Sequence, residues 1–180
     1  GKILAAHREL PVPDPAYLAL AIAIVRRAGE IQIARRVSGF RVDKKGAIDL
    51  VTEVDVECER MCLAMVTERF PDHDLLGEEL GGRAAGAQPS RYRWVLDPLD
   101  GTTNYVNGHP IFAVSVAVLY RGDPVVAAVW IPWPTEGGNE VLHARTGSGA
   151  WIGDRKLSVK KPDAGEPSRP KRGWLSTIPG

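Results

Sequence analysis

The stretch that decides the fold is Tyr92-Arg-Trp-Val-Leu-Asp-Pro-Leu-Asp-Gly-Thr-Thr-Asn104. Its mostly apolar first five residues predict a short buried strand, so Asp97 and Asp100 are expected where that strand ends. Pro98 fixes one backbone torsion between them, and such a turn can aim both carboxylates and the Leu99 carbonyl into one space. These are the oxygen ligands that Mg2+ prefers. The alternative is a plain Asp-Pro turn capped by a side-chain oxygen.

The two residues after Asp100 favour an anion. Gly101 has no side chain, so its backbone can approach a ligand closely. A helix that begins near Thr102 would direct its free N–H groups toward a phosphate, and the Thr102 hydroxyl could orient an attacking water. Together with the preceding carboxylates, this pattern predicts magnesium-dependent hydrolysis of a phosphate ester.

A second acidic group follows another apolar run, in Asp74-Leu-Leu-Gly-Glu-Glu79. We expect a short strand that ends in Glu78 and Glu79. Adjacent strand residues point to opposite faces, so one of the two glutamates should face the metal directly. If three or four carboxylates converge, they repel one another unless cations neutralise them, which argues for more than one metal ion. The alternative is a solvated pair of surface glutamates.

The third segment is Asp49-Leu-Val-Thr-Glu-Val-Asp55. Thr52 and Asp55 have the Thr-x-x-Asp spacing of a capping box that opens a helix. Asp55 could therefore serve only the helix end, or it could also accept a proton from a water molecule or from Thr102. The spacing leaves both roles open.

Taken together, these segments resemble the inositol monophosphatase family of magnesium-dependent, lithium-inhibited phosphatases. Pro110-Ile-Phe-Ala-Val-Ser-Val-Ala117 and Gly147-Ser-Gly-Ala-Trp151 follow in the family's order, and the likeness runs from about Asp14 to the end of the chain. The resemblance implies hydrolysis of a small phosphate monoester, such as inositol monophosphate, by water activated with two or three Mg2+ ions. Histidinol phosphate and fructose bisphosphate are alternative substrates.

The same resemblance implies a set of metal ligands. Glu78, Asp97 and the Leu99 carbonyl would hold a first Mg2+. Asp97 and Asp100 would share a second, and Glu78 would help place a third through a water. Glu79 would support the acidic cluster.

It also implies catalytic and substrate-binding roles. Asp55 and Thr102 would polarise the nucleophilic water, with Glu78 as the third catalytic residue. The backbone amides of Gly101 and Thr102 would hold phosphate oxygens. Lys44 or Lys45 could lie near the metal site or simply belong to a solvated loop. The substrate-binding set is Glu78, Leu99, Asp100, Gly101 and Thr102.

Members of the family also carry a Trp-Asp-x-Ala-Ala-Gly segment farther along, whose aspartate completes the second metal site. The chain contains no such segment up to Gly180. The likeness therefore covers about the first two-thirds of such an enzyme. This motivates an alternative function, that of a truncated or non-catalytic relative that binds metal or a partner without turnover.

Composition limits the other classes of function. The 23 basic and 22 acidic residues nearly cancel, and without a basic stripe we expect no nucleic-acid partner. The apolar run Ala16–Val25 is too short to span a bilayer, so we expect a core-facing helix and no membrane contact. Cys58 and Cys62 are expected as reduced core residues, in agreement with a cytoplasmic location. A homodimer is compatible with the sequence.

The expected fold class is α+β, with two helices packed on a mainly antiparallel sheet. One helix should run from Pro15 to about Arg36 and the other from about Glu53 to Arg69. By resemblance, this is the N-terminal part of a layered αβαβα sugar-phosphatase fold. We expect residues 1–13 to form a tail, 14–160 the phosphatase domain, and 161–180 a linker into a further α/β half. Short strands are expected at 75–76, 93–96, 112–119, 125–130, 140–144 and 150–152.

Overall fold

A computed structural model describes residues 10–44, 50–83, 89–132 and 141–158 of the chain. The helices in this part are α1 (Pro15–Ser38), α2 (Glu53–Arg69) and α3 (Thr102–Val106). The strands are β1 (Val42–Lys44), β2 (Leu50–Thr52), β3 (Asp74–Leu76), β4 (Gly82–Arg83), β5 (Tyr92–Asp100), β6 (Ala113–Tyr120), β7 (Asp123–Trp130), β8 (Leu142–Arg145), β9 (Gly149–Ile152) and β10 (Arg155–Lys156).

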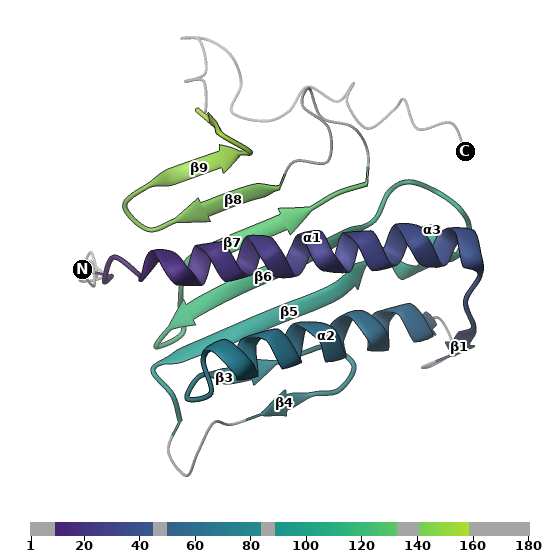
Figure 1. The fold of residues 1–180 in the computed structure, drawn as a ribbon, viewed down its shortest axis with the longest axis horizontal. Helices are drawn as coiled ribbons and strands as arrows, with labels where there is room; N and C mark the ends of the chain where they lie inside the picture. The colour runs from purple at the N-terminus through teal and green to yellow at the C-terminus, as the bar shows by residue number, and fades with distance from the viewer. Residues whose placement is uncertain (1–9, 45–49, 84–88, 133–140, 159–180) are drawn as a thin grey trace, which may run out of the picture.

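Eight of the described strands form one sheet in the order β10-β9-β8-β7-β6-β5-β3-β4. Every neighbouring pair in it is antiparallel except β3 and β5, which run parallel. Helices α1 and α2 lie side by side over one face of this sheet (Figure 1). The predicted α+β class with a mainly antiparallel sheet is therefore confirmed.

Local signals at the chain's two long helices determine where they begin. The Asp14 side chain accepts a hydrogen bond from the Ala16 amide at 2.8 Å, and Gly39, the residue that follows α1, has a φ of +87°. At α2, Thr52 accepts from the Val54 and Asp55 amides while the Asp55 carboxylate accepts from the Thr52 amide. The predicted capping box is thus present, and α2 has its expected bounds.

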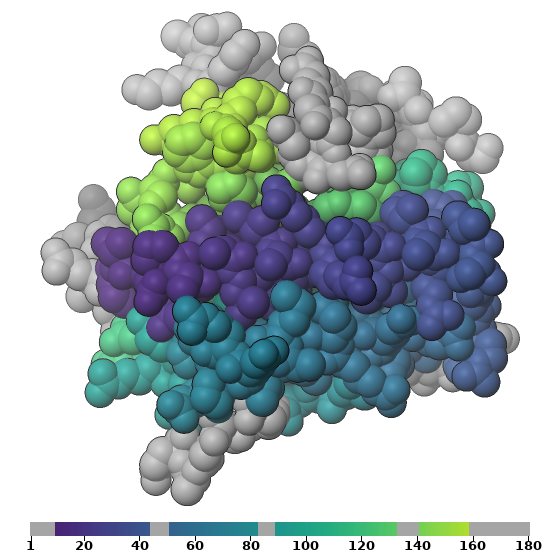
Figure 2. Space-filling view, viewed as in Figure 1, coloured from purple at the N-terminus to yellow at the C-terminus, as the bar shows by residue number. Residues whose placement is uncertain are grey.

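The core lies between the two helices and the sheet. Figure 2 shows α1 and α2 covering this face of the molecule together. Close packing is visible at Gly29 of α1, where an added Cβ would lie 2.4 Å from the Trp130 ring of β7. Cys58 and Cys62 are buried free thiols as expected, and burial raises the pKa of Cys62 to about 12. No helix in the described ranges is long and apolar enough to cross a bilayer.

Strand β5 extends farther than the sequence indicates, through the acidic motif to Asp100. Asp97 pairs with Ser115 and Asp100 with Ala113, so β5 has one more residue than β6 between these two pairs. Such a bulge leaves the extra residue outside the regular ladder, where Pro98 is tolerated because it has no N–H to donate. The prediction that the strand ends before Asp97 was wrong for this reason.

The parallel pairing of β3 with β5 positions the two acidic segments. Leu76 is the register partner of Val95. Strand β4, which follows β3, folds back antiparallel on the outer edge, so the chain re-enters the sheet beside β3 in the same direction. Because the two strands run parallel, Glu78 and Asp97 each lie two residues beyond this register pair, Glu78 after the end of β3 and Asp97 still within β5.

Several expected features differ or lie outside the described residues. The antiparallel pair β1–β2 before Thr52 and the short strand β4 were not among the predicted strands. Strand β10 was not predicted, and Ser38 rather than Arg36 ends α1. Lys45, Glu140, the tail at 1–9 and the segment 161–180 lie outside the described residues.

Candidate active site

The bulge in β5 leaves two backbone carbonyls that are bound from elsewhere in the fold. Gln32 of α1 donates from Nε2 to the Pro98 carbonyl at 2.8 Å. The Leu99 carbonyl accepts from Thr102 Oγ1 at 3.0 Å. Both Gln32 and Leu99 are buried. The irregular strand is therefore held in one conformation by side chains from α1 and from the start of α3.

Asp97 lies at this bulge with its carboxylate partly buried. Its buried Oδ1 atom accepts no hydrogen bond from the described residues. Burial, the negative charges of Glu78 and Asp100, and a hydrogen bond shared with Glu78 raise the pKa of Asp97 to about 7. Glu78 and Asp97, predicted as ligands of one ion, therefore lie within hydrogen-bonding distance of each other. Asp100 is near enough for its negative charge to raise the pKa of Asp97.

A cation bound at Glu78 and Asp97 would relieve the repulsion between their negative charges. Within the described ranges, no three carboxylate, imidazole or thiol groups come close enough to form a metal site by themselves. The predicted convergence of three or four carboxylates is therefore not present in the described part of the chain. Only Glu78 and Asp97 form a close pair among these residues, and the exposed Asp100 lies beside them. Mg2+ usually keeps several waters and substrate oxygens, so two carboxylates and the Leu99 carbonyl fit such an ion.

Asp55 connects the helix cap to the acidic motif. Its Oδ2 atom accepts from the Thr52 hydroxyl at 2.5 Å, and its Oδ1 atom accepts from Thr102 Oγ1 at 3.2 Å. Burial raises the pKa of Asp55, although its hydrogen bonds with Thr52 and Thr102 partly oppose this shift. The two roles that the sequence left open for Asp55 are therefore geometrically compatible.

Gly101 makes the turn between β5 and α3. Its φ of +86° lies in the left-handed region, and an added Cβ would lie 2.9 Å from the Ile111 carbonyl oxygen. Both features demand glycine here. Helix α3 begins at Thr102, as predicted, which brings the Thr102 hydroxyl above the Leu99 carbonyl.

The sequence pattern of the inositol monophosphatase family matches residues 15–176. This chain belongs to the inositol monophosphatase family. The matched range contains all the acidic and hydroxyl residues described above.

Three curated relatives illustrate the range of names in the family. The chain is 40% identical over 156 residues to the chloroplastic phosphatase IMPL1 of Arabidopsis thaliana, covering 85% of this chain and 42% of the relative. It is 37% identical to the fructose-1,6-bisphosphatase/inositol-1-monophosphatase of Aquifex aeolicus, covering 76% and 52%. It is 38% identical to the Nus factor SuhB of Vibrio cholerae, covering 79% and 52%. The chain thus spans about half the length of these curated relatives.

Solved structures agree with the fold. The extragenic suppressor protein suhB from Bartonella henselae superposes with a TM-score of 0.72 at 31% identity, covering 80% of this chain and 54% of that one. The IMPase of Thermotoga maritima gives a TM-score of 0.70 at 32% identity, covering 82% and 55%.

Two fully buried polar residues of this family member were missed by the sequence reasoning. Gln32 and Glu59 are each 0% exposed, one on α1 and one on α2. Gln32 binds the Pro98 carbonyl next to Asp97, whereas Glu59 accepts from the backbone amides of Glu79 and Leu80 next to Glu78. A signal was present for Glu59, because it follows Cys58 directly and precedes Cys62 by three residues on the apolar stripe of α2.

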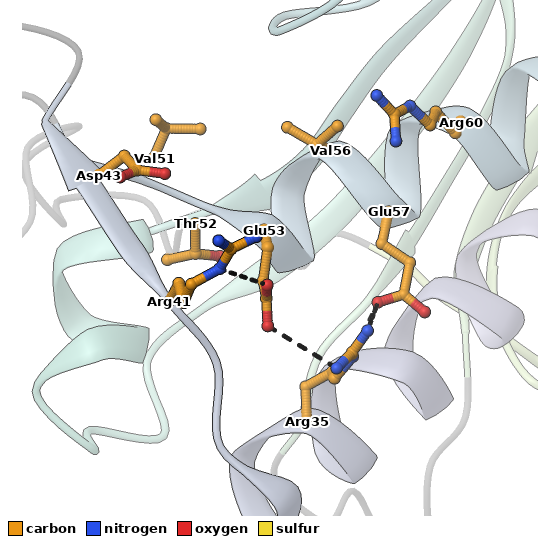
Figure 3. A pocket seen from close by; sticks show the side chains of 9 residues that line it. All are labelled: Arg35, Arg41, Asp43, Val51, Thr52, Glu53, Val56, Glu57 and Arg60. Atoms are coloured by element: carbon orange, nitrogen blue, oxygen red, sulfur yellow. Dashed lines mark hydrogen bonds and ion pairs between the residues drawn. The ribbon is translucent and has the colours of Figure 1, made fainter.

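A charged pocket of about 510 Å3 lies beside the N-terminal end of α2. Arg35 of α1 pairs with Glu57 at 2.6 Å and with Glu53 at 3.7 Å, and Arg41 pairs with Glu53 at 3.2 Å (Figure 3). The pocket touches the candidate site only through Thr52, and its residues do not include the acidic pair. The pocket is therefore not part of the candidate site. The ion pairs of Arg35 in its wall connect α1 to α2. Its lining residues are Arg35, Arg41, Asp43, Val51, Thr52, Glu53, Val56, Glu57 and Arg60.

The resemblance places Lys44 or Lys45 near the metal site, and the structure describes only the backbone of Lys44. Lys44 ends β1, in register with Leu50 of β2. Its side chain and the whole of Lys45 lie outside what the structure describes. Their role near the metal site stays a prediction.

Proposed function

We propose that this chain supplies the metal-binding and water-activating residues of a phosphate monoester hydrolase. The observation that carries the proposal is the buried Oδ1 atom of Asp97, which accepts no hydrogen bond from the described residues. Burial and the negative charge of the neighbouring Glu78 raise the pKa of this carboxyl group. A divalent cation at this pair offsets the repulsion and fills the open coordination of Asp97. Membership of a family with members named phosphatase supports the same conclusion.

Glu78, Asp97 and the Leu99 carbonyl would bind one Mg2+. Asp97 and Asp100 would bind a second, and Glu78 would hold a third through a water, with Glu79 as support. Ions bound there would lower the pKa of a coordinated water and neutralise charge on the phosphate. The Gly101 and Thr102 amides would bind phosphate oxygens.

Asp55 and Thr102 would activate the water. Thr102 Oγ1 lies between the Leu99 carbonyl and Asp55 Oδ1, so its proton can turn toward either acceptor. When it donates to Asp55, the Thr102 oxygen is left as an acceptor for a proton of the attacking water. Burial raises the pKa of Asp55 and so favours its neutral form, which suits a group that takes up a proton.

The proposed substrate is an inositol monophosphate, with fructose bisphosphate and histidinol phosphate as the other candidates. The experiment measures phosphate released from each of the three with Mg2+, with a chelator, and with millimolar lithium. We expect release that needs Mg2+ and falls with lithium. Release that continues unchanged in chelator would contradict the proposed chemistry.

The alternative function is that of a truncated or non-catalytic relative that binds metal or a partner without turnover. Its support is the relative named Nus factor, which shares 38% identity with this chain. Binding of Mn2+, measured by electron paramagnetic resonance of the free ion, and turnover of the three substrates together separate the two. A chain that folds but shows no divalent binding, or that binds Mn2+ and turns over none of the three substrates, would favour the partner-binding role.

A further inference from the structure

Glu59 is a carboxylate enclosed in the protein interior. Its side chain on α2 is 0% exposed, and within the described residues no cation pairs with it. An isolated buried carboxylate is strongly unfavourable unless hydrogen bonds satisfy it. Glu59 Oε2 accepts from the Glu79 amide at 2.7 Å, and Oε1 accepts from the Leu80 amide at 2.8 Å. Both oxygens are thus used on the loop that carries Glu78.

The loop that carries Glu78 packs closely against the Glu59 side chain at Gly77. A Cβ added to Gly77 would lie 1.9 Å from Glu59 Oε1 and 2.4 Å from its carboxyl carbon. Gly77 does not have a positive φ, so glycine is required here by space rather than by conformation. The Gly77 amide donates to the Gly81 carbonyl at 3.1 Å, which closes the turn. Glu78 is therefore enclosed in a turn whose two sides both touch Glu59.

We propose that Glu59 is a positioning residue that sets where the Glu78 carboxylate lies relative to Asp97. It acts through the amides of Glu79 and Leu80, and it touches neither substrate nor metal. The inference rests on the proposed function, because it matters for activity only if Glu78 and Asp97 share an ion. Groups that orient metal ligands from behind typically contribute about 10- to 100-fold in metal affinity or activity.

A carboxylate suits this position better than an amide. It presents two acceptors, and hydrogen bonds from amides to a charged acceptor are stronger than neutral ones. In Glu59→Gln, one acceptor becomes an NH2 group that faces a backbone N–H, so one of the two bonds is lost. In Glu59→Asp the charge is kept, but the shorter side chain cannot reach both amides from α2.

The test measures Mn2+ affinity and amide hydrogen exchange in the chain and its variants. For Glu59→Gln and Glu59→Asp we expect Mn2+ affinity to fall about 10- to 100-fold. The Glu79 and Leu80 amides should exchange faster while amides within α2 keep their protection. Glu68→Gln is the matched control, because it removes a carboxylate from the exposed surface of the same helix and should leave both readouts unchanged.

Three outcomes would overturn the inference while the proposed function stands. Unchanged Mn2+ affinity in Glu59→Gln would make the two hydrogen bonds purely structural. Full recovery in Glu59→Asp would mean that the charge acts at a distance rather than through position. If the Glu59 variants fail to fold, Gly77→Ala disturbs the same contact from the loop side, and unchanged affinity there would count equally against it. Lack of Mn2+ binding in the unaltered chain would instead overturn the proposed function, and this inference with it.

Discussion

Glu78 and Asp97 each lie two residues beyond paired positions on neighbouring parallel strands. Leu76 of β3 is in register with Val95 of β5, so the backbone brings both carboxylates to one edge of the sheet. The strand register places Glu78 and Asp97 near each other, and the loop that carries Glu78 begins directly after β3. A sheet that holds two carboxylates together in this way has a built-in preference for a cation.

The substitution Asp97→Asn should abolish metal binding while the protein still folds. It removes the carboxylate that both proposed ions would share, so Mn2+ affinity should fall by more than the roughly 10- to 100-fold expected for a residue that only supports a ligand. Titration of free Mn2+ measures this, with circular dichroism as the check of folding. Loss of the fold itself would favour the simple Asp-Pro turn.

The same substitution should change how stability depends on pH in the absence of metal. Asp97 has a folded pKa of about 7 against an ordinary value of 3.8, so the folded state holds its proton more tightly than the unfolded state. Stability is therefore lost as pH rises from about 4 to about 7. Asp97→Asn has no such loss and should unfold at the higher temperature at pH 8, with the gap closing near pH 4. Thermal melts in chelator measure it, and a gap that does not vary with pH would contradict the shift.

Thr102→Val should lower turnover without weakening the fold. The change removes the hydroxyl that contacts Asp55 and the Leu99 carbonyl, while the β-branched shape is kept. Loss of a group that helps move a proton typically costs about 100- to 10,000-fold in rate. Thr103→Val, at the exposed neighbouring position, is the matched control and should leave the rate unchanged. Phosphate release under saturating Mg2+ is the measurement, and equal rates in the two variants would remove Thr102 from the mechanism.

The features that sequence predicted well are local. Thr52 and Asp55 are three residues apart, and the capping box needs only that spacing and a following helix. The start of α3 at Thr102 follows equally from the glycine before it. The contact between Asp55 and Thr102 joins residues 47 positions apart, so its prediction rests on their chemistry and the family resemblance and not on local spacing.

The features that it missed depend on pairing at a distance. The parallel β3–β5 pair could not be predicted, since the intervening β4 is two residues long and gives a weak strand pattern. Pro98 indicated the end of a strand, yet the bulge and the hydrogen bond from Gln32, 66 residues away, keep it inside β5. The partners of Glu59 lie 20 and 21 residues farther along the chain. Its place among apolar residues was visible, but the loop that it holds was not.

His73 should make the fold less stable in mild acid. Its ring stacks on Phe70 and Tyr92, and its Nδ1 accepts from Trp94 Nε1 at 3.0 Å. Burial lowers the pKa of His73, and the nearby Asp72 and Asp74 offset this only in part. The unfolded state therefore binds the proton more readily, so stability should fall as pH drops below about 6.5. The measurement is the unfolding free energy by urea titration between pH 7 and pH 5.

The variant His73→Phe isolates this contribution. It should be less stable at pH 7, because the buried Trp94 N–H loses its acceptor, at a cost of about 1–3 kcal/mol. Its stability should then fall less steeply with acid than that of the unaltered chain. His109→Gln, at an exposed position, should keep the original slope. Parallel slopes for all three proteins would show that the pKa of His73 is the same in the folded and unfolded states.

Gly101→Ala should disrupt both the turn and the placement of Thr102, and Gly122→Ala separates the two causes. Both glycines have a positive φ, +86° and +93°, so alanine costs about 1–2 kcal/mol at either position. At Gly122 an added Cβ meets nothing within 4 Å, whereas at Gly101 it would lie 2.9 Å from the backbone oxygen of Ile111. Gly101→Ala should therefore lose more stability than Gly122→Ala in urea unfolding, and it alone should lower Mg2+-dependent phosphate release. Equal losses in the two variants would mean that Ile111 yields without strain, and that the close approach at Gly101 does not hold Thr102 over the acidic motif.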